Sequence, residues 1–363
     1  MANGDGDLET CCLSEETLSE VERVVLDRFP ASALDVLSKI MKNPSRKIHK
    51  EAGFVVYDKE SPVCFEAMIL RRLYWGSQFV WGCVGGMTCI KKGAAPEALI
   101  DLKRAIRTPT EWNRISFANS QNAESAHISR KTKSLLAGPE SCTRYLWRAV
   151  RPLACLAYFA RRKLLKAGMP AWKGFSTLGS AGFETRCGEL AIRRVMEVKS
   201  EFYDVLMKRY LETNKGLVCS RTAEEIDWIF GERIRRGETV VLGAFDAKGP
   251  CGYILMTGGE AAKRWQIHDW FAVRNDMVVL EMLLGTACRF LKKQTPAMML
   301  EVSGFPMFAQ ALLKKYLPHI RQLGHNAFSC GSKEAELREK LREMVQGDLP
   351  CWFFGPYDGD ICF

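Results

Sequence analysis

Four ionisable side chains lie within apolar runs that have the pattern of strands. They are Glu66 in "VCFEAMIL", the neighbours His268 and Asp269 in "WQIHDWF", and Glu301 in "MMLEVSG". Burial in apolar surroundings raises the pKa of a carboxyl group toward neutrality, where it can serve as a general base, so these four are the candidate catalytic residues. The alternative for each acid is a strand residue that faces solvent or pairs with a nearby arginine. Adjacent strand residues point to opposite faces, so His268 and Asp269 are not expected to act as a dyad.

A second candidate is an anion site in "CIKKGAAPEALIDL" (89–102), where two lysines and three small residues precede a predicted helix. The first turn of a helix has N–H groups without intrahelical partners, and these together with the helix dipole favour an anion. The candidate binding residues are Ile90, Lys91, Lys92, Gly93, Ala94 and Ala95. The alternative is an ordinary strand-to-helix turn, because small residues and proline are common at helix starts.

The elements that must position these residues fall into two sets with the same order. In the first half we expect helices at 14–29 and 34–41, strands at 53–58, 63–75 and 78–90, a helix at 95–107, a strand at 112–119 and a helix at 123–136. In the second half we expect helices at 202–213 and 222–236, strands at 239–246, 251–258 and 264–273, a helix at 277–294, a strand at 297–304 and a helix at 306–317. The matched order predicts an α/β protein built from two copies of one mixed-sheet unit. We expect domains at 1–138 and 201–363, joined by a basic, helical segment at 139–200.

Charge is concentrated in that joining segment. The net charge is +10, and the stretch between Glu140 and Glu184 contains eight basic residues and no acidic one. The N-terminus is acidic and lacks the pattern of a signal peptide, so we expect a cytoplasmic protein. Its 14 cysteines include no Cys-x-x-Cys pair. We therefore expect reduced thiols and no metal site.

The segment "RYLWRAVRPLACLAYFARRKLLK" (144–166) is apolar, aromatic and basic. Its arginines interrupt it too often for a membrane span. We expect an interfacial amphipathic element, broken by Pro152 into two short helices, that places the protein peripherally on the inner membrane. The residues predicted to bind anionic lipid are Arg144, Trp147, Arg148, Arg151, Arg161 and Arg162. One alternative is a basic helix packed between the domains. Nucleic acid is disfavoured because the rest of the chain is nearly neutral.

The order of elements resembles a tandem pair of the GNAT superfamily of acyl-CoA N-acyltransferases, over roughly 14–135 and 200–332. In that family the fourth strand ends at a bulge, and a loop of the type Gln/Arg-x-x-Gly-x-Gly/Ala then leads into a helix that holds the CoA pyrophosphate. The resemblance implies that 89–102 is a degenerate form of this loop and that Asn119 and Asn122 contact CoA, although helix capping is an alternative role for both. The second half has "FAVRNDMVVLEMLL" (271–284), where Asp276 would place a negative charge at the phosphate position. We therefore expect the first half to bind CoA.

The resemblance also implies the chemistry, which is direct attack of an amine on a thioester with acyl-CoA as co-substrate. We expect a primary amine of an amphipathic acceptor, as in bacterial ceramide-synthase-like enzymes that acylate sphingoid bases. Acylation of an amino sugar in envelope glycolipid synthesis, Fem-like transfer from aminoacyl-tRNA and a non-catalytic scaffold remain alternatives. The aromatic C-terminal tail, 351–363, is expected to pack against the protein.

Overall fold

The computed structural model describes residues 8–106, 108, 110–112, 114–118, 136–137, 144–164, 183–198, 201–259, 263–303, 307–322, 329–346 and 352–353. Asn119, Asn122 and the helix expected at 123–136 lie outside the described residues. Of the C-terminal tail, only the strand at 352–353 is described.

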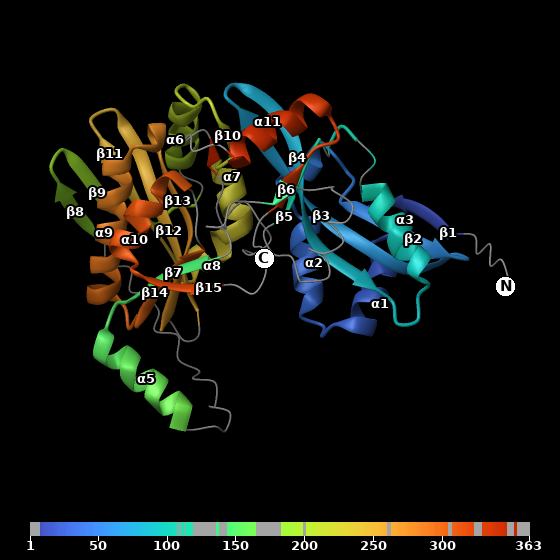
Figure 1. Ribbon diagram of the computed structural model, residues 1–363, viewed down its shortest axis with the longest axis horizontal. Coiled ribbons are helices and arrows are strands. Elements are labelled where there is room, and N and C mark those ends of the chain that lie inside the picture. The colour runs from blue at the N-terminus through green and yellow to red at the C-terminus, as the bar shows by residue number, and fades with distance from the viewer. Residues whose placement is uncertain are drawn as a thin grey trace.

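Two mixed β-sheets form the body of the protein (Figure 1). The first sheet has the spatial order β1 (Leu8–Cys12), β2 (Gly53–Asp58), β3 (Ser61–Trp75), β4 (Gln78–Ile90), β5 (Ile115–Ala118), β16 (Ser329–Gly331) and β6 (Leu136–Ala137), and β10 (Leu217–Cys219) and β17 (Trp352–Phe353) extend it beside β3. The second sheet has the order β15 (His319–Gln322), β7 (Arg144–Ala149), β14 (Met299–Ser303), β13 (Arg264–Ala272), β12 (Gly249–Gly259), β11 (Thr239–Asp246), β9 (Leu190–Val195) and β8 (Glu184–Cys187). The expected pair of mixed-sheet units is therefore present.

The helices form layers on both sides of these sheets. The described helices and helical turns are α1 (Leu18–Arg28), α2 (Ala33–Met41), η1 (Pro44–Lys47), α3 (Pro96–Ile106), α5 (Pro152–Leu164), α6 (Glu201–Leu211), α7 (Ala223–Ile226), η3 (Asp227–Gly231), α8 (Glu232–Arg235), η4 (Val273–Asn275), α9 (Met277–Gln294), η5 (Met307–Ala309), α10 (Gln310–Tyr316) and α11 (Ala335–Gln346). One hydrophobic core joins α1, α2, α6, α7, α8 and α11 to the facing sides of both sheets. Separate cores lie under α3 on the first sheet and under α9 and α10 on the second.

The sheets match strand for strand around their centres. Each contains a long antiparallel pair, β3 with β4 and β12 with β13. β4 then runs parallel to β5 and β13 runs parallel to β14, and each of β5 and β14 is followed in its sheet by two antiparallel strands. This repetition explains why the two halves of the sequence have the same order of elements.

The two halves exchange strands. β10 and β17 come from residues after 200 but belong to the first sheet, where β10 pairs with β3 and β17 with β10. β7 comes from the first half of the chain but lies between β14 and β15 of the second sheet. β16 comes from the end of the chain but lies between β5 and β6 of the first sheet. The domain boundaries expected at 138 and 200 are therefore wrong as sheet boundaries, because β7, β8 and β9 all belong to the second sheet. Each inserted strand supplies backbone partners to two neighbours that would otherwise be open edges.

The helical expectation for 144–151 is also wrong. This part of the basic segment is the strand β7, because Leu146 alternates with Tyr145 and Trp147 and is fully buried in the second core. A helix begins only at Pro152, where a missing N–H costs little. Within the joining segment expected at 139–200, residues 184–187 form β8. The remaining expected helices and strands that are described are present, with ends shifted by a few residues; the first begins at Leu18 rather than at residue 14.

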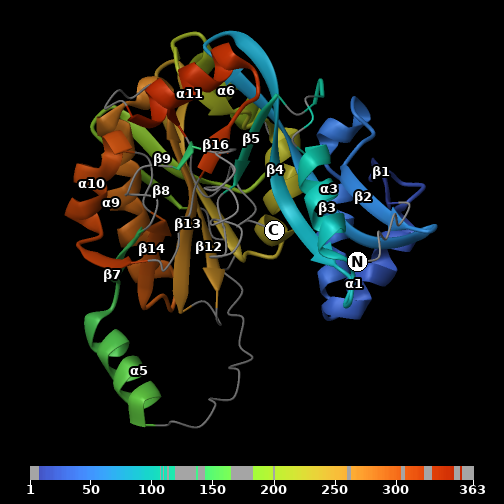
Figure 2. The same ribbon diagram turned by 45° about the vertical axis from the view of Figure 1, so that its right-hand side comes forward.

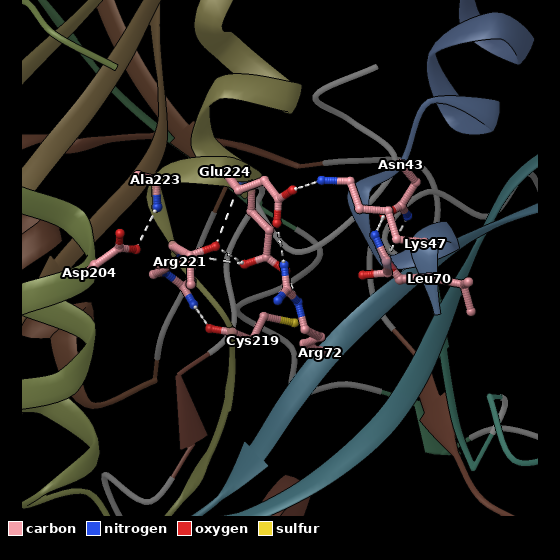
Figure 3. Close-up of polar contacts among 12 residues, drawn as sticks. Asn43, Lys47, Leu70, Arg72, Asp204, Cys219, Arg221, Ala223 and Glu224 are labelled. Atoms are coloured by element: carbon pink, nitrogen blue, oxygen red, sulfur yellow. Dashed lines mark hydrogen bonds and ion pairs between the residues drawn. The ribbon is translucent and has the colours of Figure 1, made fainter. Parts of the chain in front are cut away.

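Polar contacts fix the two halves to each other (Figure 3). Glu224 at the start of α7 accepts from Lys47 of η1 at 2.5 Å and from Arg72 of β3 at 3.3 Å. Deeper in the interface, the Lys39 Nζ donates to the Ile229 carbonyl, and the Trp228 Nε1 donates to the Lys39 carbonyl, both at 2.8 Å. α2 of the first half is thus bonded to the π-helical turn η3 of the second.

Candidate functional site

β4 and β13 occupy matching places in the two sheets, and each extends beyond the strand that pairs with it in parallel. Among the described residues, β4 pairs with β5 only at Gly82–Val84 but continues to Ile90. β13 pairs with β14 only at Arg264–Gln266 but continues to Ala272. The C-terminal part of β4 therefore forms no backbone pairs with β5, and the C-terminal part of β13 forms none with β14.

Each of these strands has a bulge at the same place. Gly86 is the extra residue of β4, because Ala67 and Met68 of β3 pair with Met87 and Gly85. A residue in a bulge is withdrawn from the ladder, so its backbone N–H can point to another acceptor. A Cβ at Gly86 would lie 2.8 Å from the Ile40 Cδ1 of α2, so only glycine fits without displacing that side chain. His268 is the matching extra residue of β13, opposite the step from Leu255 to Met256.

The loop after β4 has the features of an anion site. The Lys91 N–H is bonded to the Val63 carbonyl at 2.7 Å, and Gly93 takes the left-handed φ of 82°. Within the described part of the chain, the N–H groups of Gly93 and Ala95 have no hydrogen-bond acceptor. Lys91, Lys92, Gly93 and Ala95 are exposed, whereas Ile90 and Ala94 pack against the core under α3. Two lysines and two open donors therefore face solvent at the start of an 11-residue helix.

Two carboxylates lie close to this loop. The Asp27 Oδ2 accepts weakly from the Lys92 N–H at 3.4 Å, so an anion would compete with it there. Glu97 lies in the first turn of α3. The lysines balance these charges, and the site has no net excess of acid.

The matching place in the second half is closed by its own carboxylate. The Asp276 Oδ1 accepts from the N–H groups of Val278 at 2.8 Å and Val279 at 3.2 Å, which caps α9. Under this helix, the Trp270 Nε1 donates to the Leu280 carbonyl at 3.0 Å. Two donors in the first turn of α9 are therefore occupied, and the carboxylate of Asp276 lies at the start of this helix, where the sequence led us to expect a negative charge.

Among the predicted catalytic residues, Glu66 is the one beside the part of β4 that β5 does not pair. It is buried on β3, opposite Thr88 of β4, and forms an ion pair with Lys103 of α3. Its Oε1 lies 2.9 Å from the position a Cβ at Gly85 would take, next to the bulge. Its partner is therefore a lysine of the helix that follows the anion loop, and not the nearby arginine considered from the sequence.

Asp269 lies in a saturated ion pair of the second half. Its carboxylate accepts from the Arg221 Nε at 2.8 Å and NH2 at 3.2 Å, and from the Tyr253 hydroxyl. Arg221 also donates to the Cys219 carbonyl and lies over the Phe271 ring. Since both charged groups are buried and bonded on several sides, Asp269 serves to hold α7 against β13 and is poorly placed to take a proton.

His268 points to the same face as Asp269, so the expectation of opposite faces is wrong. The bulge is the reason, because the extra residue shifts the alternation of side chains by one. His268 is buried against Phe230, with ring centroids 5.6 Å apart. Burial, with smaller effects of Arg233 and Lys39, lowers the pKa of His268 to about 3, so this side chain is neutral at physiological pH.

Glu301 is buried on β14 between two arginines of neighbouring strands. It accepts from Arg264 of β13, and Arg321 of β15 lies 3.8 Å away. Arg321 also stacks on Tyr145 of β7, with 4.9 Å to the ring centroid. These contacts tie together four strands of the second sheet, and Glu301 lies in a different half of the chain from the anion loop.

The residues expected to bind lipid lie in three places: on β7, at the end of α9 and in α5. Arg144, Trp147 and Arg148 belong to β7, and Trp147 stacks on His319 of β15 with centroids 4.5 Å apart. Arg151 donates to the carbonyls of Lys292 and Thr295 at the end of α9. Only Arg161 and Arg162 lie in α5, and their side chains are outside the described residues. Among the described helices, none is long and apolar enough to cross a bilayer.

Three residues of this arrangement were not singled out from the sequence, namely Gly86, Lys103 and Arg221. Gly86 had a signal, because a Gly-Gly pair within an apolar strand is typical of a bulge or a close backbone approach. Lys103 and Arg221 had none, since their partners Glu66 and Asp269 lie on other elements.

Solved structures show which known fold this chain is similar to. A GCN5-related N-acetyltransferase from Kribbella flavida matches with a TM-score of 0.57 at 14% identity, over 92% of this chain and 73% of that one. One from Anabaena variabilis matches at 0.54 and 13%, over 90% and 72%. A probable N-acyltransferase from Enterococcus faecalis matches at 0.52 and 11%, over 90% and 72%. The chain therefore has a GNAT-like fold, which confirms the resemblance at the level of fold. No protein-family model matches the sequence. A search of curated protein sequences also gives no match.

Proposed function

We propose that the protein is an acyl-CoA-dependent N-acyltransferase whose donor site lies in the first half. The observation that carries this proposal is the contrast between the two matching loops. The loop before α3 combines two lysines with N–H groups that have no acceptor among the described residues, whereas at the start of α9 the carboxylate of Asp276 accepts from Val278 and Val279. An anionic pyrophosphate is favoured at the first and excluded from the second. The GNAT-like fold supports the same class of reaction.

The geometry supports a division of roles among three groups. The N–H of Gly86, withdrawn from the ladder, would stabilise the negative charge that develops on a thioester oxygen. Lys91 and Lys92 would hold the phosphates of the donor. Glu66, beside the bulge and held by Lys103, would take a proton from the attacking ammonium, directly or through a water. The amine then attacks the thioester carbonyl, the C–S bond breaks, and the thiolate leaves with a proton from solvent or the acceptor.

The acceptor that we propose is the primary amine of an amphipathic molecule, such as a sphingoid base or another amino lipid, with a long-chain acyl group as donor. Support comes from α5, whose Leu153 and Leu156 are exposed on a segment without acidic residues. Such a surface suits an enzyme whose acceptor resides in a membrane.

The test of the donor is thermal stabilisation of the purified protein by acetyl-, octanoyl- and palmitoyl-CoA, with free CoA as control. A ligand that binds only the folded state adds about 2.7 kcal/mol at 100 times its dissociation constant. Stabilisation that grows with acyl length would support a long-chain donor.

Two glycine variants show where the donor binds. Gly93→Asp should abolish the stabilisation, because it adds a negative charge and strains the backbone at φ 82°. Gly188→Asp is the matched control, since Gly188 has φ 62° and similarly open surroundings on the hairpin between β8 and β9. If no acyl-CoA stabilises the protein, the proposal fails. Salt-sensitive binding of tRNA would then point to a Fem-like donor, and the absence of both to a non-catalytic scaffold.

A further inference from the structure

Helix α5 extends away from both sheets (Figures 1 and 2). Leu153 is 83% exposed and Leu156 is 67% exposed, and Ala157 and Ala160 are exposed as well. The positions 153, 156, 157 and 160 are spaced i, i+3, i+4 and i+7, so these side chains share one face of the helix. None of these four side chains belongs to a hydrophobic core cluster of the described residues. Cys155, which is buried, lies on another face of the helix.

The base of α5 is fixed to the second sheet. The Val150 N–H donates to the Met298 carbonyl at 2.8 Å. The Arg151 NH2 donates to the carbonyls of Lys292 at 2.7 Å and Thr295 at 2.6 Å, which are open acceptors at the end of α9. The Cys155 N–H continues the chain of bonds to the Arg151 carbonyl at 2.9 Å. The helix therefore leaves the protein at a defined place, with its two leucines directed away from the packed interior.

The charge of this segment indicates what covers the stripe. The last turn of α5 contains Arg161, Arg162 and Lys163, and the sequence from 141 to 183 contains no acidic residue. A partner must therefore offer an apolar surface next to a negative one. A bilayer with anionic headgroups offers both, because an interfacial helix buries its apolar face about 5–10 Å deep and each basic residue near the surface adds about 1 kcal/mol.

We propose that α5 is an interfacial anchor whose occupant is an anionic lipid bilayer. The anchor consists of the Leu153 and Leu156 face and the basic last turn. It excludes Arg144, Trp147 and Arg148, which the second sheet holds, and Arg151, which caps α9. The proposal is independent of acyl transfer, because it concerns a helix attached to the second sheet and not the loop before α3.

The experiment is sedimentation of the full chain with vesicles of phosphatidylcholine alone or containing about 30% phosphatidylglycerol, a level at which surface charge attracts basic segments. Binding should require the anionic lipid and weaken as salt is raised. Leu153→Ser with Leu156→Ser should lower the partition coefficient at least tenfold. Arg161→Gln, Arg162→Gln and Lys163→Gln together should lower it about 100-fold, at roughly fivefold per charge.

Matched controls separate the anchor from general basicity. Ile48→Ser removes an apolar side chain that is 64% exposed on another part of the surface and should leave binding unchanged. Lys42→Gln, Lys50→Gln and Lys215→Gln together remove the same charge from exposed sites outside α5. They should have an effect several-fold smaller than the α5 triple variant. The melting temperature of the leucine variant should equal that of the parent, because both leucines are already exposed.

Three results would overturn the proposal. One is the absence of binding to anionic vesicles. Another is equal loss of binding in the α5 variants and their controls. The third is a concentration-dependent dimer that the leucine variant abolishes while vesicle binding persists, which would show that a second copy of the chain covers the stripe. Because vesicles contain neither acyl-CoA nor an amine acceptor of the reaction, these results stand apart from the test of the donor site.

Discussion

His268 of β13 and Gly86 of β4 occupy the same bulge in the two sheets. The backbone of Gly86 lies against the side chains of Ile40 and Ile69, on the strand that leads into the loop proposed to bind the donor. His268 is buried against Phe230 under a helix pair, in the half whose loop is capped by Asp276. One position of the repeat is thus a glycine that leaves its backbone accessible to a side chain of α2 in the first half, and a buried histidine packed against Phe230 in the second.

The buried His268 predicts a pH dependence of stability. Its pKa is lowered from 6.5 to about 3, so the unfolded chain binds a proton that the folded protein excludes. The contribution of neutral His268 is complete above pH 6.5 and is lost as pH falls from 6.5 toward 3, by up to about 1.4 kcal/mol per pH unit. Urea unfolding between pH 7 and pH 4.5 should therefore show a steeper loss for the parent protein than for His268→Gln. The exposed His319→Gln should keep the parent slope, and equal slopes for all three proteins would contradict the prediction.

Glu66→Gln should lower kcat at least about 100-fold with little change in acyl-CoA binding, because it removes a proton acceptor and keeps the shape of the side chain. Steady-state rates with a lipid amine and melting curves with acyl-CoA measure the two effects. Lys103→Met is the companion variant, since it removes the ion-pair partner and leaves the carboxylate. A Glu66→Gln enzyme with parental kcat would show that Glu66 only supports the packing of α3.

The pair of Arg221 and Asp269 should stabilise the packing of α7 against β13. Both side chains are buried, so Arg221→Met leaves an uncompensated carboxylate and should cost about 3–5 kcal/mol in the free energy of unfolding. Arg221→Met with Asp269→Leu should cost much less than the sum of the single variants, which a double-mutant cycle in urea measures. Lys315→Met, which breaks the exposed pair with Glu281, should change stability little. Additive single costs would argue against a coupled buried pair.

The exchange of strands predicts which fragments fold. A fragment of residues 144–363 contains every described strand of the second sheet, whereas 201–363 lacks β7, β8 and β9. We expect the longer fragment to unfold cooperatively in urea and the shorter one to be unfolded or aggregated, as circular dichroism would show. Residues 1–143 lack the first-sheet strands β10, β16 and β17 and should gain structure when 144–363 is added. Independent folding of 201–363 would disprove the dependence on β7.

Most elements could be predicted because their patterns are local. The helix expected at 277–294 has the bounds of α9, and the strands expected at 53–58 and 78–90 have those of β2 and β4. The closed loop of the second half was also predictable, because a helix N-cap depends on residues only two or three positions away, here Asp276 with Val278 and Val279.

The sequence by itself determined the repeat, the order of its elements and the unequal loops before α3 and α9, since each depends on short-range periodicity and capping. The tertiary structure decided that 144–149 is a strand, because its partners on β14 and β15 are supplied by residues about 150 or more positions away. It also decided that His268 and Asp269 share a face, because a bulge is defined by its partner strand. Tertiary packing also distinguished the three predicted acids. Glu66 forms an ion pair with one lysine beside the part of β4 that β5 does not pair, whereas Asp269 and Glu301 form ion pairs with arginines of other elements.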